Sequence, residues 1–147
     1  MCAYCCARID IKKSHNEHIE PRHPKKGMNC RSLDYYNLVA SCYGFKGEKT
    51  CGFRKGNEYD ASQFISPLDP LCENSFHYYP NGKIEGDKYT IDLLNLDTYK
   101  LRQAREAVYS VLTDMDAKTI QLVYLNEEKD MLQPFINVIK WYLRKDT

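Results

Sequence analysis

The placement of the cysteines constrains this chain more than any other feature. The 147 residues contain seven cysteines, and six of them lie within residues 1–56. Cys2 and Cys5 are separated by two residues, a spacing that lets two thiolates bind one ion. Cys42 and Cys51 form a second pair, with eight residues between them. Two such pairs supply four ligands, so we expect a tetrahedral metal site that braces a segment poor in regular core.

The remaining cysteines leave alternatives open. Cys6 follows Cys5 directly, so either thiol could be the ligand. We expect Cys30 and Cys72 to lie outside the site. Because cysteine also packs well as a small hydrophobe, a set of buried free thiols is the competing interpretation. The odd number of cysteines, and residues 1–6 without the pattern of an export signal, favour reduced cysteines in a cytoplasmic protein over disulfides.

Charge is distributed unevenly along the chain. Residues 1–56 hold 11 Lys and Arg against 5 Asp and Glu, a net charge of +6, and residues 57–147 carry a net charge of −5. This basic half predicts an anionic partner, nucleic acid first, although a solvated basic face is the alternative. With 43% hydrophobic residues and an overall charge of only +1, a mostly disordered chain is excluded. A membrane span is also excluded, because no stretch approaches the ~20 apolar residues that it needs.

The sequence divides into three regions. Residues 1–60 carry the cysteines and little helical periodicity, apart from a short helix or turn expected between Leu33 and Val39. Residues 61–89 form a connector and a β-hairpin, because Asn81-Gly82 lies between two β-prone runs. Residues 90–147 show apolar side chains at helical spacing and predict four helices.

The expected helix starts follow from residues that cap helices. Thr90, Asp97 and Asp116 each precede an apolar periodic segment and are predicted N-caps. The last helix is expected to start near Asp130, with Pro134 in its first turn, where a missing N–H costs little. Its apolar side chains lie at helical spacing, so it is the likeliest docking element for a partner.

Glu17 and His18 are the candidate catalytic pair, in the segment Glu17–Pro21. A glutamate can bind a hard divalent ion such as Mg²⁺, and a histidine can take a proton from water near neutral pH. On an extended segment, neighbouring side chains point to opposite faces, so both would serve one site only at a bend or a loop end. A surface pair without function is the alternative.

Two amides and five cations complete the candidate chemistry. Asn37 lies in an otherwise apolar and aromatic run, where its amide could tie a loop to the backbone. Downstream of Cys51, the chain offers cations suited to phosphate oxygens and one more amide, Asn57. The cations expected to bind a nucleic-acid backbone are Arg22, Lys25, Lys26, Arg54 and Lys55.

The order of these motifs resembles the HNH endonuclease superfamily, with its ββα-metal fold. The likeness is closest to the HNH nuclease subunit of Septu-type anti-phage defence systems, PtuB, some of which accompany retrons. It spans roughly two thirds of the chain, in the segments Cys2–Asn57, Phe64–Pro70, Phe76–Gly86 and Thr90–Arg105. The resemblance implies an α+β protein, with a zinc-braced ββα-metal core followed by a small hairpin and a helical C-terminal region.

The resemblance also implies roles for individual residues. His18 matches the general base, Glu17 a ligand of a catalytic Mg²⁺ or Mn²⁺, and Asn37 the central residue that holds the loop. The zinc-binding cysteines are matched by Cys2, Cys5, Cys42 and Cys51.

Two departures from the family pattern concern the second cysteine pair. The pair is stretched by Tyr43–Thr50, and Gly52 stands where a His or Asn often follows the last cysteine. Asn57 or Lys55 is left as the third residue of the HNH pattern. We prefer Asn57 as the metal ligand, with Lys55 at the phosphate.

The expected function is therefore metal-dependent cleavage of nucleic acid, DNA before RNA. The resemblance implies an SMC/ABC-like ATPase partner of the PtuA type within a hetero-oligomeric defence complex. The acidic helical residues 90–147 are its expected docking surface. Three alternatives are an inactive zinc-braced binding module, a nuclease that cuts tRNA with the same site, and a zinc-free redox protein.

Overall fold

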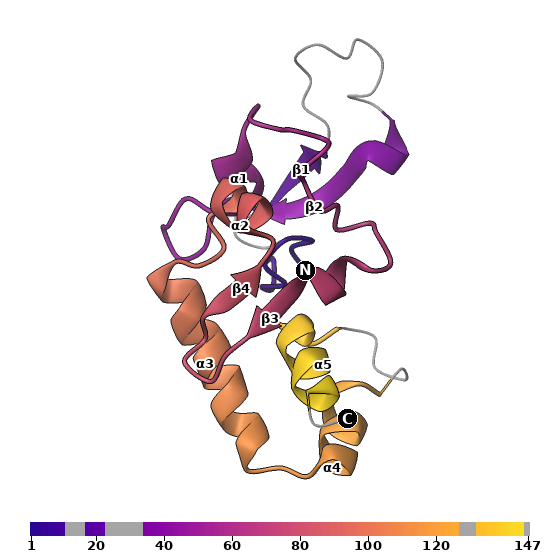
Figure 1. The fold of residues 1–147 in the computed structure, drawn as a ribbon, viewed down its shortest axis with the longest axis vertical. Helices are drawn as coiled ribbons and strands as arrows, with labels where there is room; N and C mark the ends of the chain where they lie inside the picture. Colours follow the sequence, from indigo (N-terminus) through magenta and orange to yellow (C-terminus); the bar gives the residue numbers. More distant parts are fainter. Residues whose placement is uncertain (11–16, 23–33, 127–131, 146–147) are drawn as a thin grey trace.

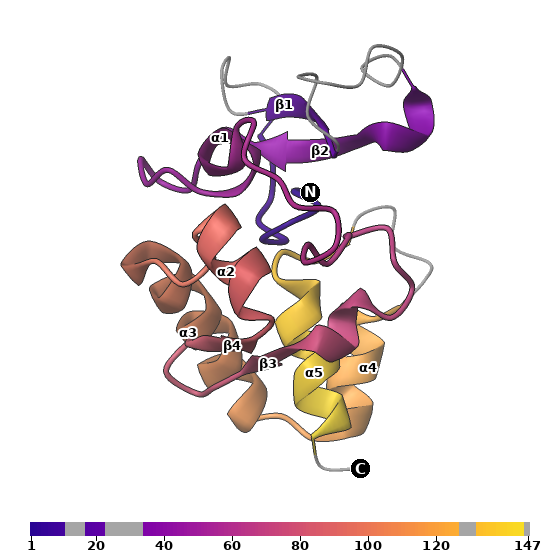
Figure 2. The same ribbon diagram turned by 45° about the horizontal axis from the view of Figure 1, so that its top comes forward.

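The structure, a computed structural model, describes residues 1–10, 17–22, 34–126 and 132–145. Within these residues the protein is a mixed α+β fold, with two antiparallel sheets of two strands each and five α-helices. No helix in the described ranges is both long and apolar enough to cross a membrane. One sheet and the first helix gather at one end of the molecule, and the later elements form the other end (Figures 1 and 2).

The N-terminal unit has the element order β1, β2 and α1. Strand β1 (Glu17–Pro21) pairs antiparallel with β2 (Leu38–Cys42), and His18 lies opposite Ser41. A 3₁₀ turn (Tyr35–Asn37) leads into β2, and Asp34 accepts a hydrogen bond from the Tyr36 N–H at its start. The predicted short helix or turn thus exists, but it ends where β2 begins at Leu38. Helix α1 (Cys51–Lys55) follows β2 after a loop.

The predicted hairpin is confirmed. Strand β3 (Phe76–Tyr78) pairs with β4 (Ile84–Gly86), and Asn81-Gly82 lies in the connecting turn. Gly82 has a φ of +74°, a region that favours glycine, and a Cβ there would collide with the backbone of Arg102. The buried Arg105 fixes the turn, because its Nε donates to the Gly82 carbonyl oxygen at 2.7 Å.

Four helices build the C-terminal part. They are α2 (Lys88–Leu94), α3 (Tyr99–Thr113), α4 (Ala117–Tyr124) and α5 (Ile136–Arg144). Helix α5 packs against α3, α4 and β3 (Figure 2). The buried side chains here are almost all apolar, among them Leu94, Leu101, Leu112, Ile120, Val138 and Ile139.

The cap predictions are partly wrong. Asp116 does cap α4, because its side chain accepts the Thr119 N–H at 3.0 Å. Helix α2 is capped by Asp87 instead of Thr90, which lies inside the helix and accepts the Ile65 N–H. Helix α3 is capped by Thr98 instead of Asp97. The carboxylate of Asp97 instead binds Arg102 and Arg105 of α3, in charge-assisted contacts.

The predicted start of the last helix is also wrong. Helix α5 begins at Ile136, so Pro134 precedes it, and Asp130 lies outside the described residues. Phe135 adopts a left-handed conformation with φ +56° at the N-cap. Ile136, Val138 and Ile139 of α5 are buried in the chain's own core, whereas Trp141, Tyr142 and Leu143 are half-buried.

The N-terminal turn lies between the two parts of the molecule (Figures 1 and 2). On one side, the Ala3 N–H donates to the Ala40 carbonyl oxygen of β2 at 2.8 Å. On the other side, the Phe135 N–H donates to the Cys6 carbonyl oxygen at 2.7 Å. The turn that carries the first two cysteines therefore connects the β1–β2–α1 unit to the start of α5.

Candidate metal centre and adjoining pocket

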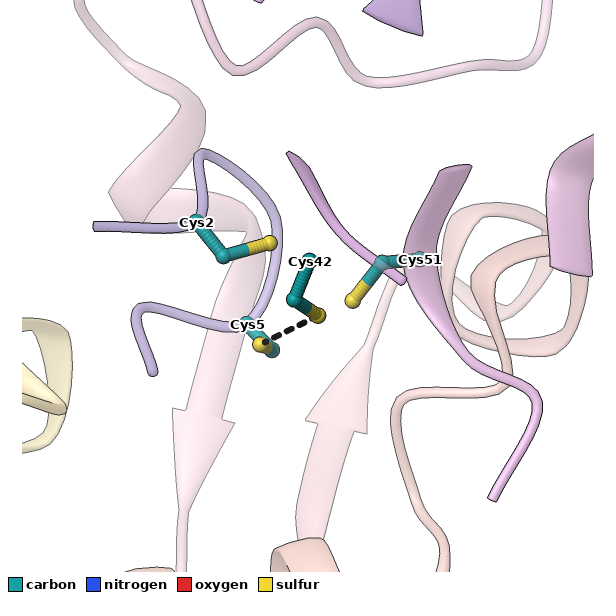
Figure 3. Close-up of side chains that lie close together, drawn as sticks. All are labelled: Cys2, Cys5, Cys42 and Cys51. Atoms are coloured by element: carbon teal, nitrogen blue, oxygen red, sulfur yellow. Dashed lines mark hydrogen bonds between the residues drawn. The ribbon is translucent and has the colours of Figure 1, made fainter. Parts of the chain in front are cut away.

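Four cysteines converge at the junction of the N-terminal turn with β2 and α1. Cys2 and Cys5 come from the turn, Cys42 ends β2, and Cys51 begins α1. Their Sγ atoms all lie within 4.8 Å of one another, and the side chains point inward (Figure 3). The Sγ atoms of Cys5 and Cys42 are 3.8 Å apart. All four residues are buried, as predicted from the two cysteine pairs.

The other cysteines lie outside this cluster. Cys6 turns away with a φ of +58°, and burial raises the pKa of its thiol to about 12. The choice between Cys5 and Cys6 is thus resolved in favour of Cys5. Cys72 is half-buried after the connector, with its Sγ 3.9 Å from the Pro67 carbonyl oxygen. Cys30 lies outside the described residues.

The cluster favours a negative charge on sulfur. The pKa of Cys2 lies far below its ordinary value, because the thiol of Cys42 first, and those of Cys5 and Cys51 next, donate hydrogen bonds to it. The pKa values of Cys5 and Cys51 are raised in turn, because their thiols are held by Cys2 and buried. Cys51 also has a φ of +58°, an uncommon conformation for a non-glycine residue and one found at functional sites. Four close, buried sulfurs in this arrangement could hold a metal ion such as zinc.

A buried carboxylate beside the cluster organises the second feature of the site. His18 and Glu20 lie two apart on β1 and therefore share one face of the strand. The Nε2 of His18 is 2.5 Å from one oxygen of Glu20, and the Nζ of Lys55 is 2.6 Å from the other. Lys55 also donates to the Pro21 carbonyl oxygen at 3.2 Å. Glu20 and Lys55 are both buried, whereas about a third of the His18 side chain is exposed.

Gly52 makes this arrangement possible. A Cβ at position 52 would lie 2.8 Å from a carboxylate oxygen of Glu20 and 2.9 Å from the Oγ of Ser41. The Gly52 N–H donates to that Oγ at 3.0 Å, and Ser41 donates in turn to the Cys42 carbonyl oxygen. The glycine is therefore required by the close approach of α1 to β1 and β2.

His18 opens onto a surface pocket of about 400 Å³. Glu20 and Gly52 line its inner side, and Asn57, just beyond α1, lines its rim and is exposed. Tyr43 and Phe53 form an aromatic wall, with their ring centroids 4.2 Å apart. The pocket thus combines a titratable imidazole, an amide and an aromatic surface.

The other expected site residues have different outcomes. Asn37 is buried at the end of its 3₁₀ turn, and its carbonyl oxygen accepts the Arg22 N–H at 2.7 Å, which ties the two ends of the β1–β2 connection. Lys55 was expected to bind phosphate. That expectation is wrong, because its ammonium group is fully buried and bound to Glu20. The side chain of Glu17, the expected metal ligand, lies outside the described part of the chain, although its backbone belongs to β1.

The other residues expected to contact nucleic acid differ in their exposure. Arg22 is half-buried and donates to the Ser66 Oγ at 2.9 Å. Arg54 is exposed and lies 3.5 Å from the carboxylate of Glu58. Lys25 and Lys26 lie outside the described residues.

Glu20 is the site residue that sequence reasoning missed. The signal that could have found it was its position two residues after His18 on a strand, which places both side chains on one face.

No protein-family model fits the chain, and none of the curated proteins is significantly similar to it. Among the described residues, the four cysteines are the only group of three or more His, Cys, Asp or Glu side chains placed to hold a metal ion.

Proposed function

We propose that this protein is a metal-dependent endonuclease of the HNH type that hydrolyses phosphodiester bonds of nucleic acid, with DNA favoured. One observation carries the proposal. The imidazole of His18 lines a surface pocket and is held by the buried carboxylate of Glu20, on a β1–β2–α1 unit joined by four clustered cysteines. This is the arrangement that a general base for water activation needs.

The hydrogen bond to Glu20 selects the reactive nitrogen of His18. A carboxylate held by the Lys55 ammonium accepts hydrogen bonds, so the Nε2–H of His18 donates to it. In the neutral imidazole, the lone pair then lies on Nδ1, which takes the proton from the attacking water. A base positioned in this way contributes ~10²–10⁴-fold to the rate. Glu20 is a positioning residue in this scheme, and Lys55 offsets its buried charge.

Two metal roles belong to the proposal. The four-cysteine donor set suits zinc, which would brace the site without taking part in the chemistry. A catalytic Mg²⁺ or Mn²⁺ would be held by Asn57 at the pocket rim together with Glu17, the first residue of β1, which reaches the face of His18 only if the strand bends at its start. When bound, such an ion stabilises the charge that develops on the phosphate and on the leaving oxygen.

Substrate and partner contacts follow from the exposed charges. Arg54, exposed on α1 next to Phe53 of the pocket, is proposed to meet a phosphate there, and Lys25 and Lys26 to extend this contact. The proposed ATPase partner of a defence complex would dock on residues 90–147. The exposed large hydrophobic side chains on the helices there are Tyr99, Val111, Leu122 and Val123.

A catalytically inactive zinc-braced binding module is the second candidate, and Gly52 is the observation that favours it. In the HNH pattern a metal-binding side chain often follows the last cysteine, and the close contact of Gly52 with Glu20 leaves no room for one here. A nuclease that cuts tRNA would use the same site as one that cuts DNA.

Cleavage assays test the proposal. Purified protein is incubated with supercoiled plasmid and with total tRNA, in Mg²⁺ or Mn²⁺, with and without the ATPase partner. We expect metal-dependent cleavage that falls by at least ~10²-fold in His18→Ala. His77→Ala, an exposed histidine on β3, is the matched control and should cut like the wild type. Equal cleavage by both variants would refute the role of His18. Nucleic-acid binding without cleavage, in protein that contains zinc, would establish the binding module.

A further inference from the structure

The aromatic wall of the pocket is unusual in its exposure. The rings of Tyr43 and Phe53 stack with an interplanar angle of 25°, yet 51% of Tyr43 and 37% of Phe53 remain exposed to solvent. Large aromatic side chains gain most of their stabilisation when they are buried. A stacked and exposed pair beside a titratable histidine therefore indicates a surface that another planar group can cover.

The chain holds this wall in place. Tyr43 begins the loop between the last two cysteines of the cluster, and the Phe45 and Glu48 backbones exchange hydrogen bonds of 3.0 and 2.9 Å across it. Gly44 has a φ of +84°, and a Cβ there would collide with the Glu48 carbonyl oxygen. The side chain of Lys100 on α3 donates to the Lys46 carbonyl oxygen at 2.5 Å. The loop is thus anchored at its tip, and little ordering is left for a ligand to supply.

Positive charge and the proposed catalytic base lie next to the wall. The Lys49 ammonium lies 5.5 Å from the centroid of the Phe53 ring, and Arg54 follows Phe53 on α1. The rings of His18 and Tyr43 are 6.3 Å apart. A base stacked on Tyr43 would therefore lie beside His18. One nucleotide could therefore contact the wall, a cation and His18 together.

We propose that Tyr43 and Phe53 stack an unpaired nucleobase beside the scissile phosphate, so that the substrate is single-stranded nucleic acid or an unpaired region of a folded one. In a duplex, both faces of every base are covered by its neighbours, so a side-chain wall can reach only a base that has left the stack. The position of the scissile phosphate rests on the nuclease proposal, whereas the stacking contact does not.

Binding measurements test the stacking contact separately from the nuclease activity. The probe is a short oligonucleotide with one 2-aminopurine, prepared as single-stranded DNA, as single-stranded RNA of the same sequence and as a duplex. It is tested without added Mg²⁺ or Mn²⁺ in the His18→Ala background. We expect tighter binding of the single strands, with quenching of the 2-aminopurine fluorescence. Tyr43→Ala should weaken single-strand binding about tenfold, the effect of losing one stacked base. Comparison of the DNA and RNA arms shows which sugar the site prefers.

Further variants control for folding and for nonspecific loss. Tyr43→Phe should retain binding, and Tyr43→Leu, which keeps an apolar contact without a π face, should lose it. Tyr99→Ala removes a tyrosine that is 69% exposed on α3 and should bind like the parent. Zinc content is measured for each variant, so that loss of the cluster is recognised.

The possible outcomes distinguish the two proposals. Equal affinity for duplex and single strand, or unchanged single-strand binding in Tyr43→Ala, overturns the stacking wall. Duplex cleavage that needs His18 but not Tyr43 leaves the nuclease in place and removes the wall. Tyr43-dependent binding of single strands without cleavage by the wild type keeps the wall and removes the nuclease.

Discussion

The two ends of the molecule are stabilised by different chemistry. In the β1–β2–α1 unit, most of the buried side chains are thiols or polar groups: Cys42, Cys51, Glu20, Asn37, Ser41, Thr50 and Lys55. In the part built from β3, β4 and the later helices, the buried side chains are mainly leucine, isoleucine and valine. The first unit thus depends on specific pairings, and the second on apolar area.

The contrast has an energetic consequence. Burial of one leucine or isoleucine side chain contributes about 1.5–3 kcal/mol, and the loss of one leaves the others in place. A four-sulfur cluster and a buried ion pair behave differently, because removing one member leaves its partners buried and unsatisfied. A substitution in the buried cluster or ion pair of the N-terminal unit should therefore lower the free energy of unfolding more, and more abruptly, than a core substitution in the helical part.

Removal of the metal should produce the largest effect. We expect zinc binding by the four cysteines to contribute on the order of 10 kcal/mol, since structural zinc binds at about 10–16 kcal/mol in small zinc domains. Cys51→Ser or strong chelation should unfold the β1–β2–α1 unit while α3 and α5 keep protection from hydrogen exchange. Elemental analysis and exchange mass spectrometry measure the two effects. Cys72→Ser, outside the cluster, is the control. Full zinc content in Cys51→Ser would contradict the assignment.

Loss of the buried cation should produce the second-largest effect. Lys55→Met leaves the Glu20 carboxylate buried without its ammonium partner, and we expect a loss of about 3–5 kcal/mol in the free energy of unfolding. Denaturant titration with zinc present measures it. The double variant Glu20→Gln with Lys55→Met should recover part of this loss, because no uncompensated charge remains. Additive effects of the two single changes would show that the pair does not interact.

A core truncation gives the matching test in the helical part. Leu101 on α3 is fully buried, so Leu101→Ala should cost about 2–5 kcal/mol through lost contacts and a cavity. In contrast to Cys51→Ser, this variant should keep its zinc. Release of zinc together with the helical transition would show that the two parts unfold as one cooperative unit.

The smallest expected effect concerns a helix start. Asp116→Ala removes the side chain that accepts the Thr119 N–H at the N-terminus of α4, and we expect a loss of about 1 kcal/mol. Thermal denaturation measures it. Asp114→Ala, an exposed aspartate two residues earlier, is the matched control and should change stability less. Equal effects of the two changes would assign the loss to net charge instead of the cap.

Sequence reasoning succeeded where the signal was local. The spacing of the four cysteines predicted the cluster, and the pair Asn81-Gly82 predicted the hairpin turn. The cap of α4 was also predicted, because Asp116 has no competing partner among the groups that the structure describes. In each case the residues that decide the structure are close in sequence or carry a specific chemistry.

Failures arose where a distant partner decided the outcome. Asp97 looks like a cap, but Arg102 and Arg105 bind its carboxylate and Thr98 takes the role. The start of α5 is set at Phe135, whose N–H is bound by Cys6, 129 positions earlier. Propensity and periodicity contain no information about such contacts.

The burial of Lys55 had a signal that was not used. Lys55 lies four residues after Cys51, so both occupy one face of a helix, and a buried Cys51 draws Lys55 toward the same interior. Lysine is rarely buried without a partner, and Glu20 is the only acid in β1 besides Glu17. The pair could thus have been inferred once the cluster was assumed.

The contact between Gly52 and Glu20 has a consequence for the evolution of this protein. Because a Cβ at position 52 would come within 2.8 Å of the carboxylate, a larger residue there requires the Glu20 side chain to move or to be replaced. Relatives with a larger residue after the last cysteine should carry a shorter side chain in place of Glu20. They should then also lack a buried lysine at the position of Lys55. Position 20 is therefore expected to vary together with positions 52 and 55, more than thirty residues later.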